Sequence, residues 1–473
     1  MALHHIGVAG TRQRAELHGV RIGPGLLARH LDPEGKGVGV GLRGSHLQDL
    51  VPGCIGDLEN WLHQLIHVAM IRVMARVLLL VPSATYRAAD FVAAAKAIGA
   101  EIVVASDVAP VIPDATGTRS IAVPLDDPEA AARAIVELDG RRGVDAVVAL
   151  DDRGVLVAAR AAAHLGLPHN SPESVGRTRD KEAMRDALAS GEVPQPRYAA
   201  FDDPADVVGL FEAFGGGPCV VKPVGLSASQ GVIRADDAVA AVAAAERAQT
   251  IAGGGRLLVE EYVAGDEVAV EGLLRDSSLE VLAVFDKPDP MVGPYFEETI
   301  YVTPSRLPAA VLEQVARVTA EACSSIGLTE GPIHAELRID GMRLWILEVA
   351  ARSIGGLCAR ALRFGAGISL EEVILRHALG MSLEGLEREA GASGVMMIPI
   401  PRAGTLAGVG GRDAALAVPG IVGLEITIPS GRVVAPLPEG DRYLGFVFAR
   451  ASTPAEVEHA LRSAHATLTI TIH

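Results

Sequence analysis

Between residues 74 and 178 the apolar positions fall into short continuous runs that alternate with stretches of helical spacing. The apolar runs lie at 75–81, 101–106 and 144–150, and the helical stretches at 88–98, 128–138 and 154–165. Strands that are apolar at every position predict a parallel sheet covered by helices on both faces. We therefore predict a small Rossmann-like α/β domain over residues 74–178. Asp151 and Asp152 follow its last strand, where open α/β sheets place ligands and where a helix N-cap also favours aspartate.

The pattern changes after residue 178. Longer strands, some of them with alternating polarity, are predicted at 219–223, 257–263, 267–274, 334–340 and 344–350. With helices between them, they indicate an α+β central domain with antiparallel sheet at 179–385. The last segment, 386–473, is rich in glycine and short strands and has one helical stretch near 454–464. We predict a smaller β-rich C-terminal closing domain there.

The first 73 residues show weak periodicity and no alternation of strands and helices. Met70 and Met74 stand just before the first clear strand. We therefore expect residues 1–73 to be an N-terminal extension that is either disordered or not native. Deleting residues 2–73 should then leave solubility and activity intact.

The net charge of −16 argues against a general affinity for nucleic acid or anionic membrane, because both need basic patches. The longest apolar run, near Val77 to Val81, is too short to span a bilayer. The 4 cysteines are scattered without a CxxC pair, which is typical of a reduced compartment. We expect a cytoplasmic protein that acts on small molecules.

A candidate phosphate site follows the predicted strand 219–223. Lys222, one of only five lysines in the chain, ends this strand, and a loop of small residues follows that includes Ser227, Ser229 and Gly231. Small side chains let backbone N–H groups approach phosphate oxygens. A plain hairpin loop is the alternative, and the GxxxxGK[ST] pattern of a P-loop is absent.

A second group of polar residues surrounds the turn between two strands. Glu260 and Glu261 end one strand, and Glu267 begins the next. Backbone groups at 261–263 could read an adenine edge while a carboxylate accepts from ribose hydroxyls. Acidic residues at a strand end are more often simply solvated.

The strongest chemical signal is a pair of glutamates, Glu336 and Glu348, each inside an apolar strand of one predicted hairpin. Two buried carboxylates that close together need a cation between them or a shared proton. Hard oxygen ligands suit Mg²⁺, which would bridge to phosphates. The alternative is a structural ion pair with Arg338 or Arg352.

Arg352 follows the second glutamate by four residues, and Gly355 and Gly356 come next. A fixed cation there could steady charge on a transferred phosphoryl group or a substrate carboxylate. The glycines would let a substrate approach the backbone.

These motifs, in this order over residues 75–470, resemble the ATP-grasp superfamily, and within it the carboxylate–amine ligases that include bacterial L-amino acid (dipeptide) ligases. The resemblance implies that Lys181 and Lys222 contact ATP phosphates and that Glu336 and Glu348 hold Mg²⁺, with Mn²⁺ as an alternative ion. It further implies an adenine pocket at Glu260, Glu261 and Val263, a ribose contact at Glu267, and a catalytic role for Arg352 with Lys222. The substrate-facing candidates are Lys287, Glu298, Tyr301, Gly355 and Gly356.

The implied function is an ATP-dependent ligase that forms an amide from a small carboxylate and an amine through an acyl phosphate. A biotin-carboxylase-like or purine-pathway ligase would share the ATP site, and a catalytically silent ATP-binding module is an alternative of another class. A dehydrogenase based on the GVGVG stretch at 37–41 is rejected because this stretch follows no strand. Whether the chain forms a homodimer is left open.

Overall fold

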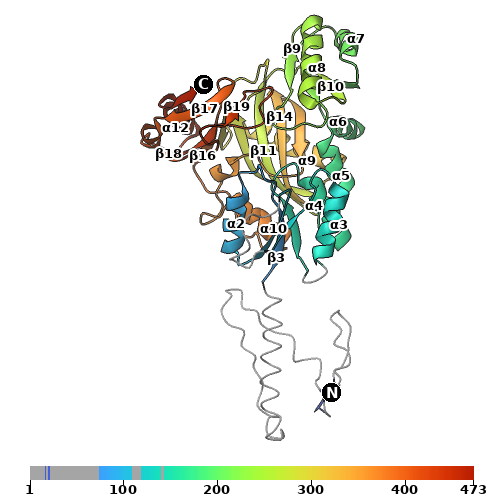
Figure 1. The fold of residues 1–473 in the computed structure, drawn as a ribbon, viewed down its shortest axis with the longest axis vertical. Coiled ribbons are helices and arrows are strands. Elements are labelled where there is room, and N and C mark those ends of the chain that lie inside the picture. The colour runs from blue at the N-terminus through green and yellow to red at the C-terminus, as the bar shows by residue number, and fades with distance from the viewer. Residues whose placement is uncertain (1–15, 18–19, 22–73, 109–118, 140–142) are drawn as a thin grey trace. The chain divides into compact units, whose positions relative to one another are not determined.

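The computed structural model describes residues 16–17, 20–21, 74–108, 119–139 and 143–473 (Figure 1). The predicted N-terminal extension lies outside the described residues, apart from two paired two-residue strands, β1 (Glu16–Leu17) and β2 (Val20–Arg21). Residues 73–473 form one structural unit, which contains all the other helices and strands described. Among its described helices, none combines the length and the apolar character that a membrane span needs.

The predicted N-terminal α/β domain is confirmed as a four-stranded parallel sheet in the order β5-β4-β3-β6. Its elements are β3 (Arg76–Leu80), α2 (Ala88–Ala97), β4 (Glu101–Ser106), β5 (Arg119–Ala122), α3 (Pro128–Asp139), β6 (Ala146–Ala149) and α4 (Val155–Leu165). Strand β3 is apolar throughout because Val77 and Leu79 pack with α2, whereas Leu78 and Leu80 pack with α3 and α4. The edge strand β5 was not predicted, since Arg119 and Ser120 break its apolar run.

Two short helices lead into the central domain. Asp180 ends α5 (Pro172–Arg179) and caps α6 (Lys181–Ser190), where its side chain accepts a hydrogen bond from the Ala183 N–H. Lys181 is therefore held at the first position of a helix.

A four-stranded antiparallel sheet with the order β7-β10-β8-β9 follows. Its elements are β7 (Tyr198–Phe201), η1 (Pro204–Asp206), α7 (Val207–Ala213), β8 (Cys219–Pro223), β9 (Ile233–Ala235), α8 (Ala238–Ala252) and β10 (Leu257–Glu261). Alternate residues such as Val221 and Val259 pack on α7 and α8. The opposite face, with Lys222 and Glu260, is left for polar contacts.

The largest sheet has eight strands in the order β15-β14-β11-β12-β13-β16-β20-β18. These strands are β11 (Asp266–Arg275), β12 (Ser278–Lys287), β13 (Ile300–Thr303), β14 (Gly331–Asp340), β15 (Arg343–Ala350), β16 (Ala392–Ile398), β18 (Ile421–Ile426) and β20 (Gly445–Ala451). Apolar side chains on one face of β11, β14 and β15 pack against α6 and α9 (Ala309–Ile326). The other face of these strands carries a row of charged residues.

The eight-stranded sheet crosses the boundary predicted at residue 386. Strand β16 pairs with β13, with Ile300 opposite Met396, so the C-terminal segment extends the central sheet (Figure 1). Sequence periodicity marks strands but not their partners, which is why this continuity was not predicted. The remaining elements are η2 (Cys358–Ala361), α10 (Leu370–Ala378), β17 (Gly404–Gly410), α11 (Arg412–Leu416), β19 (Val433–Val434), α12 (Pro454–Ala466) and β21 (Thr469–Ile472).

Candidate active site

A cleft lies between the four-stranded sheet and the eight-stranded sheet, and it gathers most of the predicted site residues. Those that line it are Lys181, Lys222, Ser227, Ser229, Glu260, Glu261, Val263, Glu267, Glu298, Glu336 and Glu348. The predicted residues that do not line it are Gly231, Lys287, Tyr301, Arg352, Gly355 and Gly356. Segments more than 160 residues apart in sequence thus meet at one place.

The charged wall of the cleft follows from strand alternation on β14. His334, Glu336 and Arg338 project to one face, while Ala335 and Leu337 are fully buried on the other face. On the neighbouring strands Glu271 lies opposite His334, Glu348 lies opposite Glu336 and Glu267 lies opposite Arg338, so the charges lie side by side.

The two glutamates predicted to share a metal are direct cross-strand partners: Glu336 of β14 lies opposite Glu348 of β15, next to a bulge in the register. The alternative, that arginines hold them, is wrong for both candidates, since Arg338 pairs with Glu267 at 2.7 Å and Arg352 pairs with Asp152 at 2.7 Å. Within the described residues, no ion pair to Glu348 is found.

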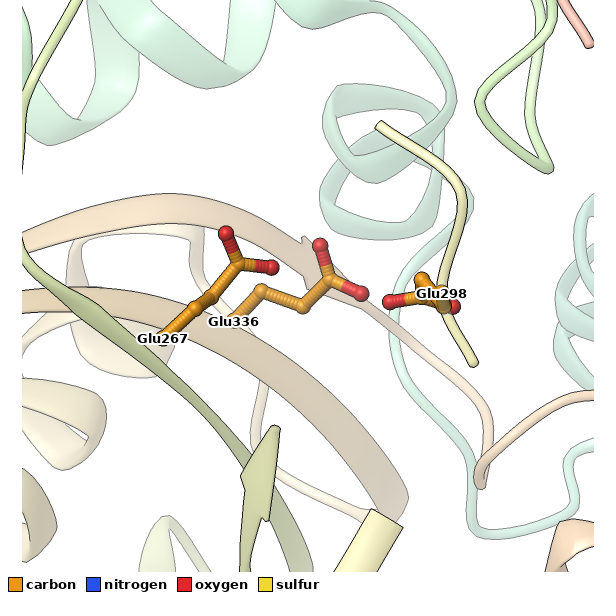
Figure 2. A group of neighbouring side chains, drawn as sticks. All are labelled: Glu267, Glu298 and Glu336. Carbon is orange, nitrogen blue, oxygen red and sulfur yellow. The ribbon is translucent and has the colours of Figure 1, made fainter. Parts of the chain in front are cut away.

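A third and a fourth carboxylate change the predicted arrangement. Figure 2 shows Glu267 and Glu336 on adjacent strands and Glu298 on a separate loop segment, with their carboxylates turned toward one another. One oxygen from each lies within 4.8 Å of the others, close enough to hold one ion. Glu348 is not a member of this group, so Glu336 belongs both to the pair with Glu348 and to the group with Glu267 and Glu298.

Lys287 reaches into the three-carboxylate group from β12. Its Nζ lies 2.7 Å from Glu267 and 3.1 Å from Glu336, and it also pairs with Glu298. Its side chain is only 3% exposed. The residue predicted to face a substrate is therefore buried, and it supplies an internal cation to the acidic cluster.

The buried charges shift the pKa values of Glu298 and Glu336 in opposite directions. Burial raises the pKa of Glu298, and Glu336 adds to the rise against the opposing effect of Lys287. Burial also acts to raise the pKa of Glu336, but Lys287 and His334 outweigh it and lower that pKa to about 2. Glu336 is thus held ionised, the state that a cation ligand requires.

The donor set fits a hard divalent ion. Glu336 and Glu348 face one cleft with carboxylate oxygens, the ligand type that Mg²⁺ prefers, and no cysteine lines this cleft among the described residues. Mg²⁺ sites in proteins commonly use one or two carboxylates together with phosphate oxygens. We therefore expect Glu336 and Glu348 to hold the ion.

Lys222 and Arg185 both form ion pairs with the carboxylate of Glu260. The Lys222 Nζ lies 2.7 Å from one oxygen of Glu260, and the Arg185 Nε lies 2.7 Å from the other. Burial would raise the pKa of Glu260, but Arg185 and Lys222 lower it to about 2. The carboxylate predicted to line an adenine pocket is therefore fully engaged, and it fixes Lys222 at the cleft wall.

The predicted adenine and ribose contacts are also partly engaged within the protein. The N–H groups of Glu261 and Tyr262 donate to the carbonyls of Arg197 and Pro218, each at 2.9 Å. Both carboxylate oxygens of Glu267 pair with cations, one with Lys287 and the other with Arg338, so the predicted contact between Glu267 and a ribose is not supported.

The small-residue loop connects β8 to β9, so it is a hairpin loop that also lines the cleft. Lys181 Nζ donates to the carbonyl of Leu226 at its start. Ala228 and Ser229 both have a φ of 56°, a left-handed conformation unusual for non-glycine residues. Gly231 lies behind the loop, because its N–H donates to the Pro438 carbonyl at 3.0 Å and a Cβ there would lie 2.9 Å from Pro223.

Arg352 is anchored by the N-terminal domain. Its Nη2 lies 2.7 Å from Asp152, which also pairs with Arg179 at 3.1 Å. Burial raises the pKa of Asp152, but the two arginines outweigh burial and lower it to about 2. Asp152 is not the cap of α4, whose N-cap is Gly154 without a side-chain bond. The aspartate at the strand end thus serves to orient an arginine.

Two of the substrate-facing candidates contact protein instead. Tyr301 is 1% exposed, and its hydroxyl donates to Glu298 at 2.5 Å. Gly356 has a φ of 58°, and a Cβ there would lie 2.8 Å from the Phe446 ring. Gly355 differs from both, since it is exposed and a Cβ added to it would meet no heavy atom within 4 Å. Of the three, only Gly355 leaves its backbone open to a substrate.

Sequence reasoning missed Arg185, His334 and Glu271. Arg185 is 0% exposed and follows Lys181 by four residues, a spacing that places both on one side of α6. His334 precedes Glu336 by two residues, so strand alternation puts it on the same face. Its Nδ1 lies 2.5 Å from Glu271, whose other oxygen accepts from the Ile354 N–H at 2.9 Å.

Three domain families match the chain in order. Residues 92–169 match the ATP-grasp N-terminal domain, residues 216–361 match the ATP-grasp domain, and residues 396–473 match the L-amino acid ligase C-terminal domain 2.

Individual relatives are more distant. An uncharacterized protein of Sinorhizobium fredii is 25% identical over 63% of this chain and 63% of its own length. Alanine–anticapsin ligase of Bacillus subtilis is 24% identical over 51% of this chain and 55% of its own length. The chain therefore spans between half and two thirds of the length of these two relatives.

The fold is similar to the crystal structure of an L-amino acid ligase from Bacillus licheniformis. The TM-score is 0.71 with 24% sequence identity, covering 84% of this chain and 99% of that chain. The chain thus has the ATP-grasp fold, with an ATP-grasp N-terminal domain at 92–169, an ATP-grasp domain at 216–361 and an L-amino acid ligase C-terminal domain at 396–473.

Proposed function

We propose that this chain is an ATP-dependent ligase that joins a small carboxylate to an amine through an acyl phosphate and releases ADP and phosphate. The observation that supports it most is that Glu336 and Glu348 lie directly opposite each other and line the same cleft as Lys222. The names of the relatives, alanine–anticapsin ligase and L-amino acid ligase, support the same reaction class.

The residues of the cleft divide by chemistry. Lys181, Lys222 and the loop hydroxyls of Ser227 and Ser229 supply cations and donors for a triphosphate. Glu336 and Glu348 would hold Mg²⁺, which supplies charge neutralisation for phosphate oxygens when bound. The cleft thereby positions the terminal phosphoryl group for attack in line with its leaving oxygen.

The reaction has two steps. An oxygen of the substrate carboxylate attacks the γ-phosphorus of ATP, and the bond to ADP breaks. The amine nitrogen then attacks the acyl carbon. The bond between the acyl carbon and the bridging phosphate oxygen breaks, phosphate leaves with its electron pair, and the nitrogen loses a proton. Arg352, held by Asp152, would stabilise negative charge in either step.

The test is ADP and phosphate release with mixtures of amino acids and small carboxylates, with Mg²⁺ or Mn²⁺. Added hydroxylamine should trap the acyl phosphate as a hydroxamate even when the amine substrate is left out. Glu348→Gln should abolish turnover, whereas Cys323→Ser, on α9 in the core, should not. ADP release that depends on bicarbonate would favour a carboxylase-like ligase, and ATP binding without ADP release under any mixture would favour a silent module.

A further inference from the structure

A second cavity, of about 90 Å³, lies outside the nucleotide cleft. Its walls come from the segment after η2, the loop before β16, and the strands β16 and β20. Three of its lining residues are arginines, Arg363, Arg388 and Arg450, and one is an acid, Glu389. None of its lining residues lines the nucleotide cleft.

The positive charge in this cavity is not balanced. Arg450 Nη1 lies 3.3 Å from Glu389, and this is the cavity's one ion pair among the residues that the structure describes. In the same part of the chain, no carboxylate lies within 4 Å of the Arg363 or Arg388 guanidinium nitrogens. Three guanidinium groups therefore face one carboxylate.

Backbone carbonyls satisfy only some of the guanidinium donors. Arg363 Nη1 donates to the carbonyls of Arg360 and Leu362, and Arg388 Nη1 donates to Gly391 at 3.2 Å. A guanidinium has five N–H donors, so others remain for a ligand. These bonds also fix the two side chains in the cavity wall.

Partial burial makes the positive charges of Arg363 and Arg388 unfavourable. Burial lowers the pKa of Arg363 and the neighbouring Arg450 lowers it further, against the opposing effects of Glu371, Asp90 and Glu389. Burial likewise lowers the pKa of Arg388. Ser393, which is 6% exposed, lines the same cavity. An anion in the cavity would relieve the repulsion and use the free donors.

We propose that this cavity binds a small oxyanion, a phosphate or carboxylate group, between Arg363, Arg388 and Arg450. Planar guanidinium groups recognise both kinds of oxyanion through paired N–H donors. Since one water occupies about 30 Å³ of liquid, the cavity has room for such a group.

Isothermal titration calorimetry of the full chain tests this proposal. Phosphate and succinate are titrated separately at constant ionic strength, and chloride is the reference anion. At least one of the two anions should bind, and which one binds identifies the group. Arg363→Gln and Arg388→Gln should each weaken binding by about tenfold or more, because a hydrogen bond to a charged group is lost. Arg388→Lys keeps the charge but loses the planar fork and should also weaken it.

The matched control is Arg412→Gln, which removes one exposed arginine of α11 and should leave anion binding unchanged. Lys222→Met separates the two sites: it should remove any phosphate binding that the nucleotide cleft contributes and leave the binding that Arg363→Gln and Arg388→Gln weaken. Circular dichroism checks that each variant is folded. Equal binding by wild type and the cavity variants, loss of binding in Lys222→Met alone, or no binding of either anion by wild type would overturn the proposal.

Discussion

Replacing Asp152 with asparagine removes one negative charge with almost no change in volume. In the folded chain this carboxylate is shared by Arg352 at 2.7 Å and Arg179 at 3.1 Å, and its side chain is 17% exposed. The two arginines lower its pKa from 3.8 to about 2. At 1.36 kcal/mol for each pKa unit, this difference corresponds to about 2 kcal/mol of stability at neutral pH.

The sign of the pH dependence follows from the lowered pKa. A carboxylate whose pKa is lower in the folded state stabilises the fold fully above its unfolded value of 3.8, and the effect is lost as pH falls toward about 2. Urea denaturation should therefore show the same difference between wild type and Asp152→Asn at pH values of about 7 and about 5. The difference should shrink below about pH 4.

Activity should change in parallel, because Arg352 loses the group that orients it. We expect kcat to fall by about tenfold to a hundredfold while the KM for ATP changes little, since the residues proposed to bind ATP are other ones. Asp126→Asn is the control: Asp126 is 92% exposed and pairs with Arg153 on the same domain, and such surface pairs contribute little. Stability and kcat equal to wild type in Asp152→Asn would refute the positioning role.

Three further substitutions test other contacts. Glu260→Gln leaves Arg185 and Lys222 without their shared carboxylate and should cost about 3–5 kcal/mol in urea denaturation; an unchanged midpoint would count against this network. Burial acts to lower the pKa of His334, but Glu271 and Glu336 outweigh it and raise that pKa to about 9. His334→Gln, measured with EDTA present, should therefore destabilise the fold by about 3 kcal/mol below pH 6.5 and by little above about pH 9. A difference in stability that does not change with pH would contradict this. Gly356→Ala should lower the thermal midpoint by an amount equivalent to about 1–3 kcal/mol, since its Cβ would meet the Phe446 ring, and a wild-type midpoint would show that the ring moves aside freely.

The parts of the fold that sequence predicts well are those that local periodicity encodes. The β14–β15 hairpin was predicted from two apolar runs and a turn, and its register brings Glu336 opposite Glu348 as expected. The parallel N-terminal sheet was equally clear, because its strands are apolar on both faces.

The contacts that sequence could not predict join distant segments. Asp152 and Arg352 are 200 residues apart, and neither has a local pattern that names the other. Glu298 lies on a loop without periodicity, so its approach to Glu336 depends on how the β12–β13 connection folds. Lys287 was noticed as a rare lysine, but only the strand register shows it opposite Glu267.

The backbone ladder between β13 and β16 limits which part of this protein can move. Ile300 through Thr303 pair with Ser393 through Met396, so swinging the C-terminal strands as a separate flap would break several main-chain hydrogen bonds at once. Among the residues that the structure describes, the four-stranded layer that carries Lys222 is joined to the segment before β13 by an isolated bridge between Ile233 and Tyr295. By contrast, the C-terminal strands belong to the same hydrogen-bonded sheet as β14, the strand that carries Glu336.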